Sequence, residues 1–121
     1  MIVTVTLNPS IDVGCTCDHV GPERKIRCRR PEYDAGGGGL NVARAVANLQ
    51  GRAQALWLTG GHTGRMLGEI LQQRGVAGHA VETTGAVRIN YYVHEQSSGR
   101  EYRFVMPGPE VSPDAIEAVG E

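Results

Sequence analysis

The residues best suited to bind a small polar molecule are Asp12, a run of four glycines from Gly36 to Gly39, and Asn41. Glycine lets a ligand approach the main chain closely. The first N–H groups of a helix have no internal partners and lie at the positive end of its dipole, so a glycine-rich turn at a helix start is suited to an anion or a polar ligand. Apolar residues at helical spacing follow the run at once, which disfavours a flexible linker: Val42, Ala43, Val46, Ala47 and Leu49.

Asp12 follows an uncharged apolar stretch, residues 2–7, which predicts a strand buried on both faces in a parallel sheet. Ligands of open α/β sheets bind beyond the carboxyl ends of the strands. A carboxylate there can accept hydrogen bonds from neighbouring hydroxyls, and the amide of Asn41 can both donate to and accept from a hydroxyl. Each residue also has a purely structural interpretation, as a turn-capping aspartate and as a locally satisfied helix-start asparagine.

The glycine run fails two familiar tests for nucleotide binding. A Walker loop ends in Gly-Lys-Ser/Thr, whereas this run ends in Leu40-Asn41. The dinucleotide fingerprint G-x-G-x-x-G directly follows a strand, but neither possible frame ends in glycine, and no obvious apolar strand precedes the run. No serine has a compelling histidine or acidic partner for nucleophilic catalysis.

A cationic segment, residues 24–30, is expected to form a strand beside residues 13–20. Strand alternation would place three cations on one face: Lys25, Arg27 and Arg29. That face is either solvated or in contact with a phosphate, and the lack of interleaved aromatic residues disfavours nucleic acid. The carboxylate, the glycine run and these cations together predict a site for a phosphorylated polyol.

The composition is typical of one globular domain: 121 residues, formal net charge -1, 40% hydrophobic and 21% charged. Near-neutral charge argues against a general nucleic-acid binder. No apolar run approaches membrane-spanning length, and the N-terminus does not resemble a signal peptide. Three cysteines make no disulfide framework and no paired metal-ligand motif, so we expect a cytoplasmic protein without a metal site: Cys15, Cys17 and Cys28.

Strand and helix patterns alternate along much of the chain, which predicts an α/β fold with a parallel sheet and right-handed crossovers. The expected strands are 2–7, 53–59 and 78–82, with helices after the glycine run and at about 64–74. From residue 87 the period becomes two, which predicts a hairpin of residues 87–95 and 100–106. With the strands of residues 13–30, this hairpin is expected to form a small antiparallel lid. The predicted division is an α/β core of 1–12, 34–86 and 107–121 and a β lid of 13–33 and 87–106, with a last helix capped by Ser112.

Four motifs occur in collinear order: Asn8-Pro9-Ser10-Ile11-Asp12, Gly36-Gly37-Gly38-Gly39-Leu40-Asn41-Val42-Ala43-Arg44-Ala45, Gly60-Gly61-His62-Thr63-Gly64 and Glu101-Tyr102-Arg103-Phe104-Val105-Met106-Pro107-Gly108. On these motifs the chain resembles the N-terminal part of the ribokinase-like (PfkB) carbohydrate kinases, and within them the 6-phosphofructokinase type. Relatives often carry a lysine where this chain has Gly38. Its absence favours that type over fructose-1-phosphate kinases, while tagatose-6-phosphate kinases stay an alternative.

The resemblance implies phosphoryl transfer from ATP, with Mg²⁺, to a hydroxymethyl group of fructose 6-phosphate. It implies that the sugar contacts Asp12, Gly37, Gly38, Gly39 and Asn41, and that the sugar phosphate contacts Lys25, Arg27, Arg88 and Arg103. The lid would close over the sugar and exclude water. It would also form the interface of a homodimer.

The catalytic aspartate of this family lies in a Gly-Ala-Gly-Asp motif, and neither that motif nor Asn-x-x-Glu occurs in this sequence. Positioning and electrostatics supply most of phosphoryl-transfer catalysis, and the parts that position ATP are missing. We therefore expect a substrate-binding N-terminal portion that is inactive alone, with ATP and Mg²⁺ used only by the full-length kinase. A non-catalytic sugar-phosphate-binding module is the alternative.

Overall fold

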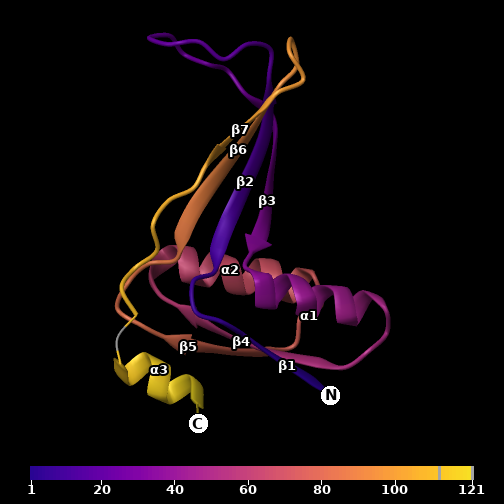
Figure 1. Ribbon diagram of the computed structural model, residues 1–121, viewed down its shortest axis with the longest axis vertical. Coiled ribbons are helices and arrows are strands. Elements are labelled where there is room, and N and C mark those ends of the chain that lie inside the picture. Colours follow the sequence, from indigo (N-terminus) through magenta and orange to yellow (C-terminus); the bar gives the residue numbers. More distant parts are fainter. Residues whose placement is uncertain (112, 121) are drawn as a thin grey trace.

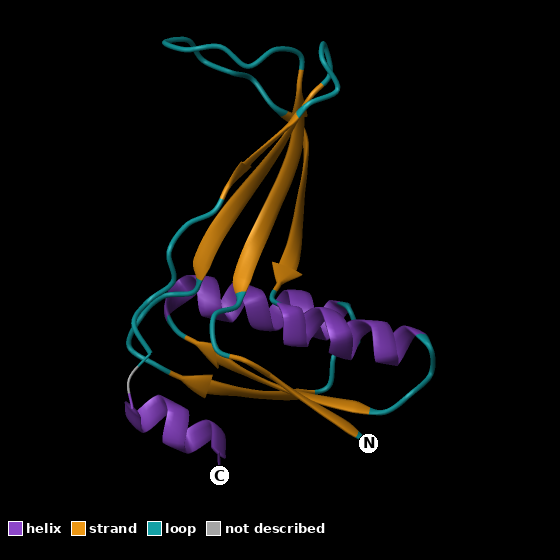
Figure 2. Ribbon diagram, in the orientation of Figure 1, coloured by secondary structure: helices purple, strands orange, loops and turns teal. Residues whose placement is uncertain are grey.

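The computed structural model describes residues 1–111 and 113–120. Two helices lie between a small parallel sheet and a second sheet that extends away from them (Figures 1 and 2). The elements in chain order are β1 (Ile2–Thr6), β2 (Ser10–Cys17), β3 (Arg29–Gly36), α1 (Gly38–Asn48), β4 (Ala53–Thr59), α2 (Gly61–Gln73), β5 (Gly78–Glu82), β6 (Arg88–Glu95), β7 (Glu101–Phe104) and α3 (Pro113–Gly120).

The core sheet has the order β1-β4-β5, and both of its strand pairs are parallel. This confirms the predicted parallel α/β arrangement, because parallel neighbours need crossover connections that place helices on the faces of the sheet. Helices α1 and α2 cover one face, and α3 lies against β4 and β5 on the other (Figure 1). The three strands end at the same edge, where the chain leaves for the second sheet.

The second sheet, called the lid sheet here, has the order β3-β2-β6-β7. Its two outer pairs are antiparallel, as predicted, but the central pair β2–β6 is parallel. The prediction of an entirely antiparallel lid was therefore wrong at its centre. Both β2 and β6 start where the chain leaves the same edge of the core sheet, so both run outward in the same direction.

The strand predicted at residues 24–30 begins at Arg29 instead and continues to Gly36. Residues 24–28 belong to the loop between β2 and β3, so the shared strand face predicted for Lys25 and Arg27 does not exist. A strand also leads directly into the glycine run, contrary to the expectation. Its polar sequence hid it, because most of its side chains are exposed and pairing with β2 rather than apolar periodicity defines it.

One buried core joins the base of the lid sheet to the helices and the core sheet. Its fully buried apolar members are Ile11, Ala35, Leu40, Ala43, Ala55, Trp57, Leu67, Ile70, Leu71 and Val87. The apolar stripe predicted for α1 is only partly buried in this core, because Val42 is 48% exposed and Leu49 is 84% exposed. The strand predicted to be buried on both faces also differs: Val3 is 62% and Val5 49% exposed, on the face of β1 away from α1.

The boundaries of the later helices refine the sequence-based expectations. Helix α2 starts at Gly61 rather than near residue 64, and Gly75, with φ of 73°, follows its end as predicted for a C-terminal glycine. Helix α3 starts at Pro113, and its predicted cap, Ser112, lies outside the described residues. Over residues 1–111 and 113–120, no helix has the length and apolar character needed to cross a membrane.

Candidate sugar-phosphate site

Asp12 lies at the base of the lid sheet, where its carboxylate is held by two donors. The Ser10 hydroxyl donates to Asp12 Oδ1 over 2.7 Å, and the amide of Asn90 donates to the same oxygen over 3.3 Å. Asn90 is itself fixed, because it is 3% exposed and its Oδ1 accepts the N–H of Met106 over 2.9 Å. Among the described residues nothing donates to Asp12 Oδ2, which is therefore free to accept a ligand hydroxyl.

The glycine run brings the start of α1 against the end of β1 and beside Asp12. A Cβ on Gly36 would lie 2.5 Å from Asp12 Oδ2, and a Cβ on Gly39 would lie 2.5 Å from Thr6 Oγ1. Gly37, the residue before the helix, has φ of 130°, which L side chains rarely adopt. Gly38 differs from its neighbours, because a Cβ there would meet no atom within 4 Å.

The first turn of α1 offers unpaired backbone donors next to that carboxylate. The first backbone bond of the helix runs from Asn41 N–H to Gly37 O over 2.9 Å, and no side chain caps the helix. The N–H groups of the preceding residues therefore have no intrahelical acceptor. The Asn41 side chain is exposed and accepts only a long hydrogen bond of 3.4 Å from Arg44 Nη2. Its amide is therefore held only weakly by other residues of the fold.

Arg88 joins three segments at the base of the lid sheet. Its guanidinium donates to Met106 O over 3.0 Å and to Asn8 O over 3.2 Å, while its Nε is buried without a partner among the described residues. Arg88 precedes Asn90 by two positions on β6, so the two residues share a face of the sheet. Asp12 belongs to that face too, because it pairs directly with Asn90.

Arg103 lies farther along the same face, on β7, opposite Tyr92. Its guanidinium is 6.0 Å from the centroid of the Tyr92 ring and 3.4 Å from Glu101 Oε2, and its side chain is 67% exposed. Arg88 and Tyr92 are four residues apart, which corresponds to roughly 13 Å along a strand. The structure therefore places both arginines on the face that carries Asp12, with Arg103 farther out along the lid sheet than Arg88.

Lys25 and Arg27 lie elsewhere. The loop that contains them, between β2 and β3, is at the far end of the lid sheet from α1 (Figure 1). Both residues are exposed. Within one chain they are therefore at the opposite end of the lid sheet from Asp12.

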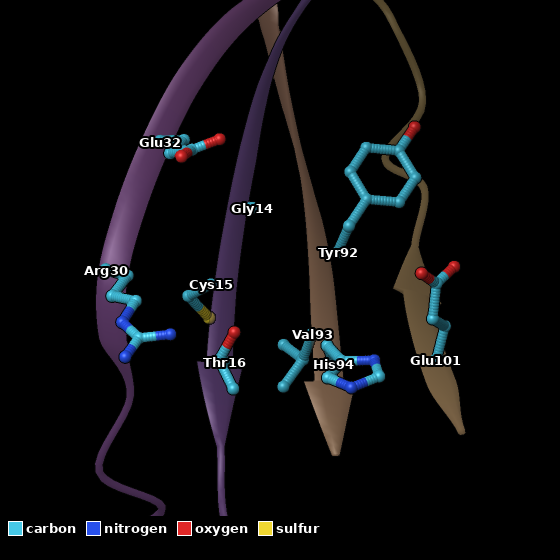
Figure 3. A pocket seen from close by; sticks show the side chains of 9 residues that line it. All are labelled: Gly14, Cys15, Thr16, Arg30, Glu32, Tyr92, Val93, His94 and Glu101. Carbon is cyan, nitrogen blue, oxygen red and sulfur yellow. The ribbon is translucent and has the colours of Figure 1, made fainter. Parts of the chain in front are cut away.

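Beyond Asp12 and Asn90 the lid sheet contains a hollow of about 280 Å³. Figure 3 shows its lining, in which Gly14 contributes no side chain and Tyr92, His94 and Glu101 come from β6 and β7. A Cβ on Gly14 would meet no atom within 4 Å. The missing side chain keeps this face of the lid sheet open.

Sequence reasoning missed Ser10, Asn90 and Glu95 as organising residues. Ser10 and Asn90 position Asp12. Glu95 lies at the tip of the lid sheet, where its carboxylate accepts hydrogen bonds from the loop that follows β2 and from the turn between β6 and β7. The Ser98 hydroxyl, then the N–H of Val20 and the His19 ring, hold the pKa of the Glu95 carboxyl below its usual range.

Within residues 1–111 and 113–120, no group of histidine, cysteine, aspartate or glutamate side chains is arranged to hold a metal ion.

A parallel βαβ unit with a lid sheet over its strand ends, and a carboxylate beside a glycine-rich helix start, is the arrangement expected of a ribokinase-like kinase. Residues 4–117 match the family model described as pfkB family carbohydrate kinase, and the chain belongs to that family.

Its similarity to phosphofructokinases is strong over nearly the whole chain. It is 42% identical over 120 residues to "ATP-dependent 6-phosphofructokinase isozyme 2" of Escherichia coli (strain K12), covering 99% of this chain and 39% of that protein. It is 41% identical to the protein of the same name from Mycobacterium tuberculosis (strain CDC 1551 / Oshkosh), covering 92% of this chain and 33% of that protein.

The fold agrees with a solved structure of this class. The crystal structure of phosphofructokinase-2 from Escherichia coli in complex with fructose-6-phosphate superposes with a TM-score of 0.91 at 42% identity, covering 98% of this chain and 39% of that chain. The chain thus spans about two fifths of the length of the relatives that it matches.

Proposed function

We propose that this chain is the sugar-phosphate-binding part of an ATP-dependent kinase that phosphorylates fructose 6-phosphate to fructose 1,6-bisphosphate. The observation that carries the proposal is the carboxylate of Asp12, with one oxygen fixed by Ser10 and Asn90 and the other open beside the start of α1. The named relatives and the fructose-6-phosphate complex support the choice of substrate.

In this proposal the sugar lies between the base of the lid sheet and the start of α1. Asp12 Oδ2 accepts hydrogen bonds from sugar hydroxyls, and the N–H groups of Gly38 and Gly39 donate to sugar oxygens. Gly37 allows the turn into the helix, since its φ of 130° favours glycine. The amide of Asn41 exchanges its long bond to Arg44 for a hydroxyl of the sugar.

The sugar phosphate lies toward Arg88 and Arg103, on the face of the lid sheet that continues from Asp12. Arginine suits this role because its planar fork binds two phosphate oxygens at once. Arg103 is largely exposed and would exchange its contact with Glu101, whereas Arg88 would exchange its bonds to the two carbonyl oxygens. We propose Lys25 and Arg27 as phosphate ligands only in a homodimer formed through the lid sheets, where the loop of the second copy supplies them.

Phosphoryl transfer itself is assigned to no residue of this chain. ATP and Mg²⁺ are the phosphoryl donor and metal of the complete kinase. The residues described here bind and orient the acceptor and help to exclude water.

Isothermal titration calorimetry of the chain with fructose 6-phosphate tests the binding part of the proposal. We expect heat of binding for the wild type and a loss of about 1.5–3 kcal/mol for Asp12→Asn, the scale of a hydrogen bond to a charged group. Glu69→Gln is the matched control, because it makes the same chemical change on the exposed side of α2. A folded wild-type chain that gives no heat, or an Asp12→Asn variant with unchanged affinity, would contradict the assignment.

Incubation of the chain with ATP, Mg²⁺ and the sugar phosphate tests the proposal that it does not catalyse phosphoryl transfer by itself. No ADP should form with the chain alone. Steady ADP release that depends on the sugar would show that the chain has catalytic groups of its own.

A further inference from the structure

A second carboxylate lies beside that of Asp12 at the base of the lid sheet. The register pairs Asp12 of β2 directly with Asp34 of β3, so both side chains belong to one face of the sheet. Two arginines contact Asp34 Oδ1, with Arg44 Nη1 at 2.8 Å and Arg74 Nε at 3.5 Å. The proposed function assigns a ligand to Asp12 and to none of the other three residues.

Arg44 joins this carboxylate to the start of α1. Its Nη1 donates to Asp34 Oδ1, and its Nη2 donates to Asn41 Oδ1 over 3.4 Å, which is longer than most hydrogen bonds. Asn41 and Arg44 are three residues apart on α1, so they are neighbours on one face of the helix. Figure 1 shows β3 ending at the helices, and there this ion pair joins the lid sheet to α1. One nitrogen of the guanidinium is thus fixed by an ion pair, while the other is held weakly.

The weakly held side of the Arg44 guanidinium is accessible to a ligand. The Arg44 side chain is 30% exposed and that of Asp34 is 42% exposed. Among the described residues, Asn41 is the only acceptor for Arg44 Nη2. An arginine that a carboxylate already holds at one nitrogen loses less conformational entropy when its other nitrogen binds a ligand. A hydroxyl that displaces the long bond to Asn41 therefore meets an N–H donor that is already in place.

We propose that Arg44 is a further ligand of the sugar. One sugar hydroxyl inserts between the two side chains, so that its oxygen accepts from Arg44 Nη2 and its proton is donated to Asn41 Oδ1. Asp34 is a positioning residue, because it acts on the sugar only by holding Arg44. The proposal rests on the proposed function, since it adds a contact to the same bound sugar.

Arg44 and Asp12 are complementary in their hydrogen bonding. An ionised carboxylate only accepts hydrogen bonds and a guanidinium only donates them, whereas a hydroxyl does both. Two hydroxyls of one sugar can therefore satisfy Asp12 Oδ2 and Arg44 Nη2 at the same time. The two residues together would select the arrangement of hydroxyls on the sugar, while its phosphate lies toward Arg88 and Arg103.

Isothermal titration calorimetry with fructose 6-phosphate can compare the two arginines that contact Asp34. Arg44→Gln should weaken binding by about tenfold to a hundredfold, which corresponds to the loss of a hydrogen bond from a charged donor. Arg74→Gln is the matched control, because it removes an ion pair to the same oxygen of Asp34 but leaves the donor beside Asn41. Its affinity should equal that of the wild type.

Two further variants separate a contact with the sugar from a structural role. Arg44→Lys keeps a positive charge for Asp34, but its single ammonium cannot also reach the hydroxyl beside Asn41. Its free energy of unfolding in urea should match that of the wild type while its affinity falls, so this variant decides the question even if Arg44→Gln does not fold. Asp34→Asn should weaken binding by about twofold to tenfold, the scale of immobilising one long side chain, and should have no further effect in the Arg44→Gln background.

The outcomes distinguish this proposal from the proposed function. A folded wild-type chain that gives no heat of binding overturns both. Wild-type binding that stays unchanged in Arg44→Lys, or that weakens equally in Arg44→Gln and Arg74→Gln, overturns the role of Arg44 alone. Additive losses in the Asp34→Asn and Arg44→Gln double variant would show that Asp34 does not act through Arg44.

Discussion

Asn90 provides the sharpest test of how the site is built, because it touches Asp12 from inside the protein. We consider Asn90→Asp, which keeps the shape of the side chain and an oxygen able to accept the Met106 N–H. It removes the donor to Asp12 and places a second carboxylate 3.3 Å from Asp12 Oδ1, the present length of the amide bond. The Asn90 side chain is buried and cannot turn to solvent without leaving the Met106 N–H unpaired.

The size of the effect follows from Coulomb repulsion. Two unit charges at that separation repel by about 5 kcal/mol at an effective dielectric constant of about 20. Asp12 is only partly buried, so solvent screening and small movements should leave about 2–3 kcal/mol. That corresponds to a rise of about two pKa units for the carboxyl introduced at position 90.

The sign of the pH dependence is fixed by this rise. A group whose folded-state pKa is raised costs nothing below its unfolded pKa and destabilises the fold as pH rises through the folded pKa. Urea unfolding should therefore show Asn90→Asp to be less stable than the wild type at pH 8, with the deficit smaller by about 1 kcal/mol at pH 5.

Asn90→Leu is the control, since it loses both hydrogen bonds without adding charge. Asn90→Leu should lower the free energy of unfolding by about 2–3 kcal/mol, the sum of a hydrogen bond to a charged group and one to a backbone N–H. This loss of stability should not depend on pH between 5 and 8. If Asn90→Asp has the same deficit at pH 5 and pH 8, the two carboxylates do not interact, and Asn90 does not position Asp12.

Three further predictions concern other parts of the site and the lid sheet. In the full-length protein, Arg88→Ala and Arg103→Ala should each weaken fructose 6-phosphate binding by about 1.5–3 kcal/mol, and unchanged calorimetric affinity in both variants would reject the phosphate role. Gly39→Ala should lower the free energy of unfolding by about 1–3 kcal/mol through overpacking, whereas Gly38→Ala, with open space around it, should be neutral or stabilising by up to about 1 kcal/mol in thermal unfolding. Because the pKa of Glu95 is lowered, its contribution is present above the ordinary glutamate pKa of about 4.3 and is lost as pH falls through the folded value. The protection of the Val20 amide against exchange, relative to its intrinsic rate at each pH, should fall at acid pH in the wild type but not in Glu95→Gln, and equal pH profiles of protection would count against this anchor.

Local pattern predicted much of the core correctly. The apolar strand of residues 53–59 and the inner side of α2, with Leu67, Ile70 and Leu71 buried, lie where the sequence placed them. The hairpin of β6 and β7 also formed around the predicted turn. In each case hydrophobic periodicity or turn chemistry acts over a few residues, and burial in the core reinforces it.

The lid sheet was harder because its strands have no such periodicity. β3 is mostly exposed and charged, so its position is decided by hydrogen bonding to β2. The loop cations were consequently assigned to a strand that does not contain them. The burial of β1 was overestimated for a related reason, since a sequence pattern does not show whether a helix covers each face.

The sequence by itself determined the family, the alternation of strands and helices, and the chemical types at the site. Asp12, the glycine run and Asn41 were identified from residue type and position relative to elements, which are local properties. Only the tertiary structure decided which groups hold the carboxylate and on which face the arginines lie. Asn90 is 78 residues from Asp12 along the chain and meets it through the parallel pairing of β2 with β6. No local pattern encodes that register, because it depends on where two distant strands leave the same edge of the core sheet.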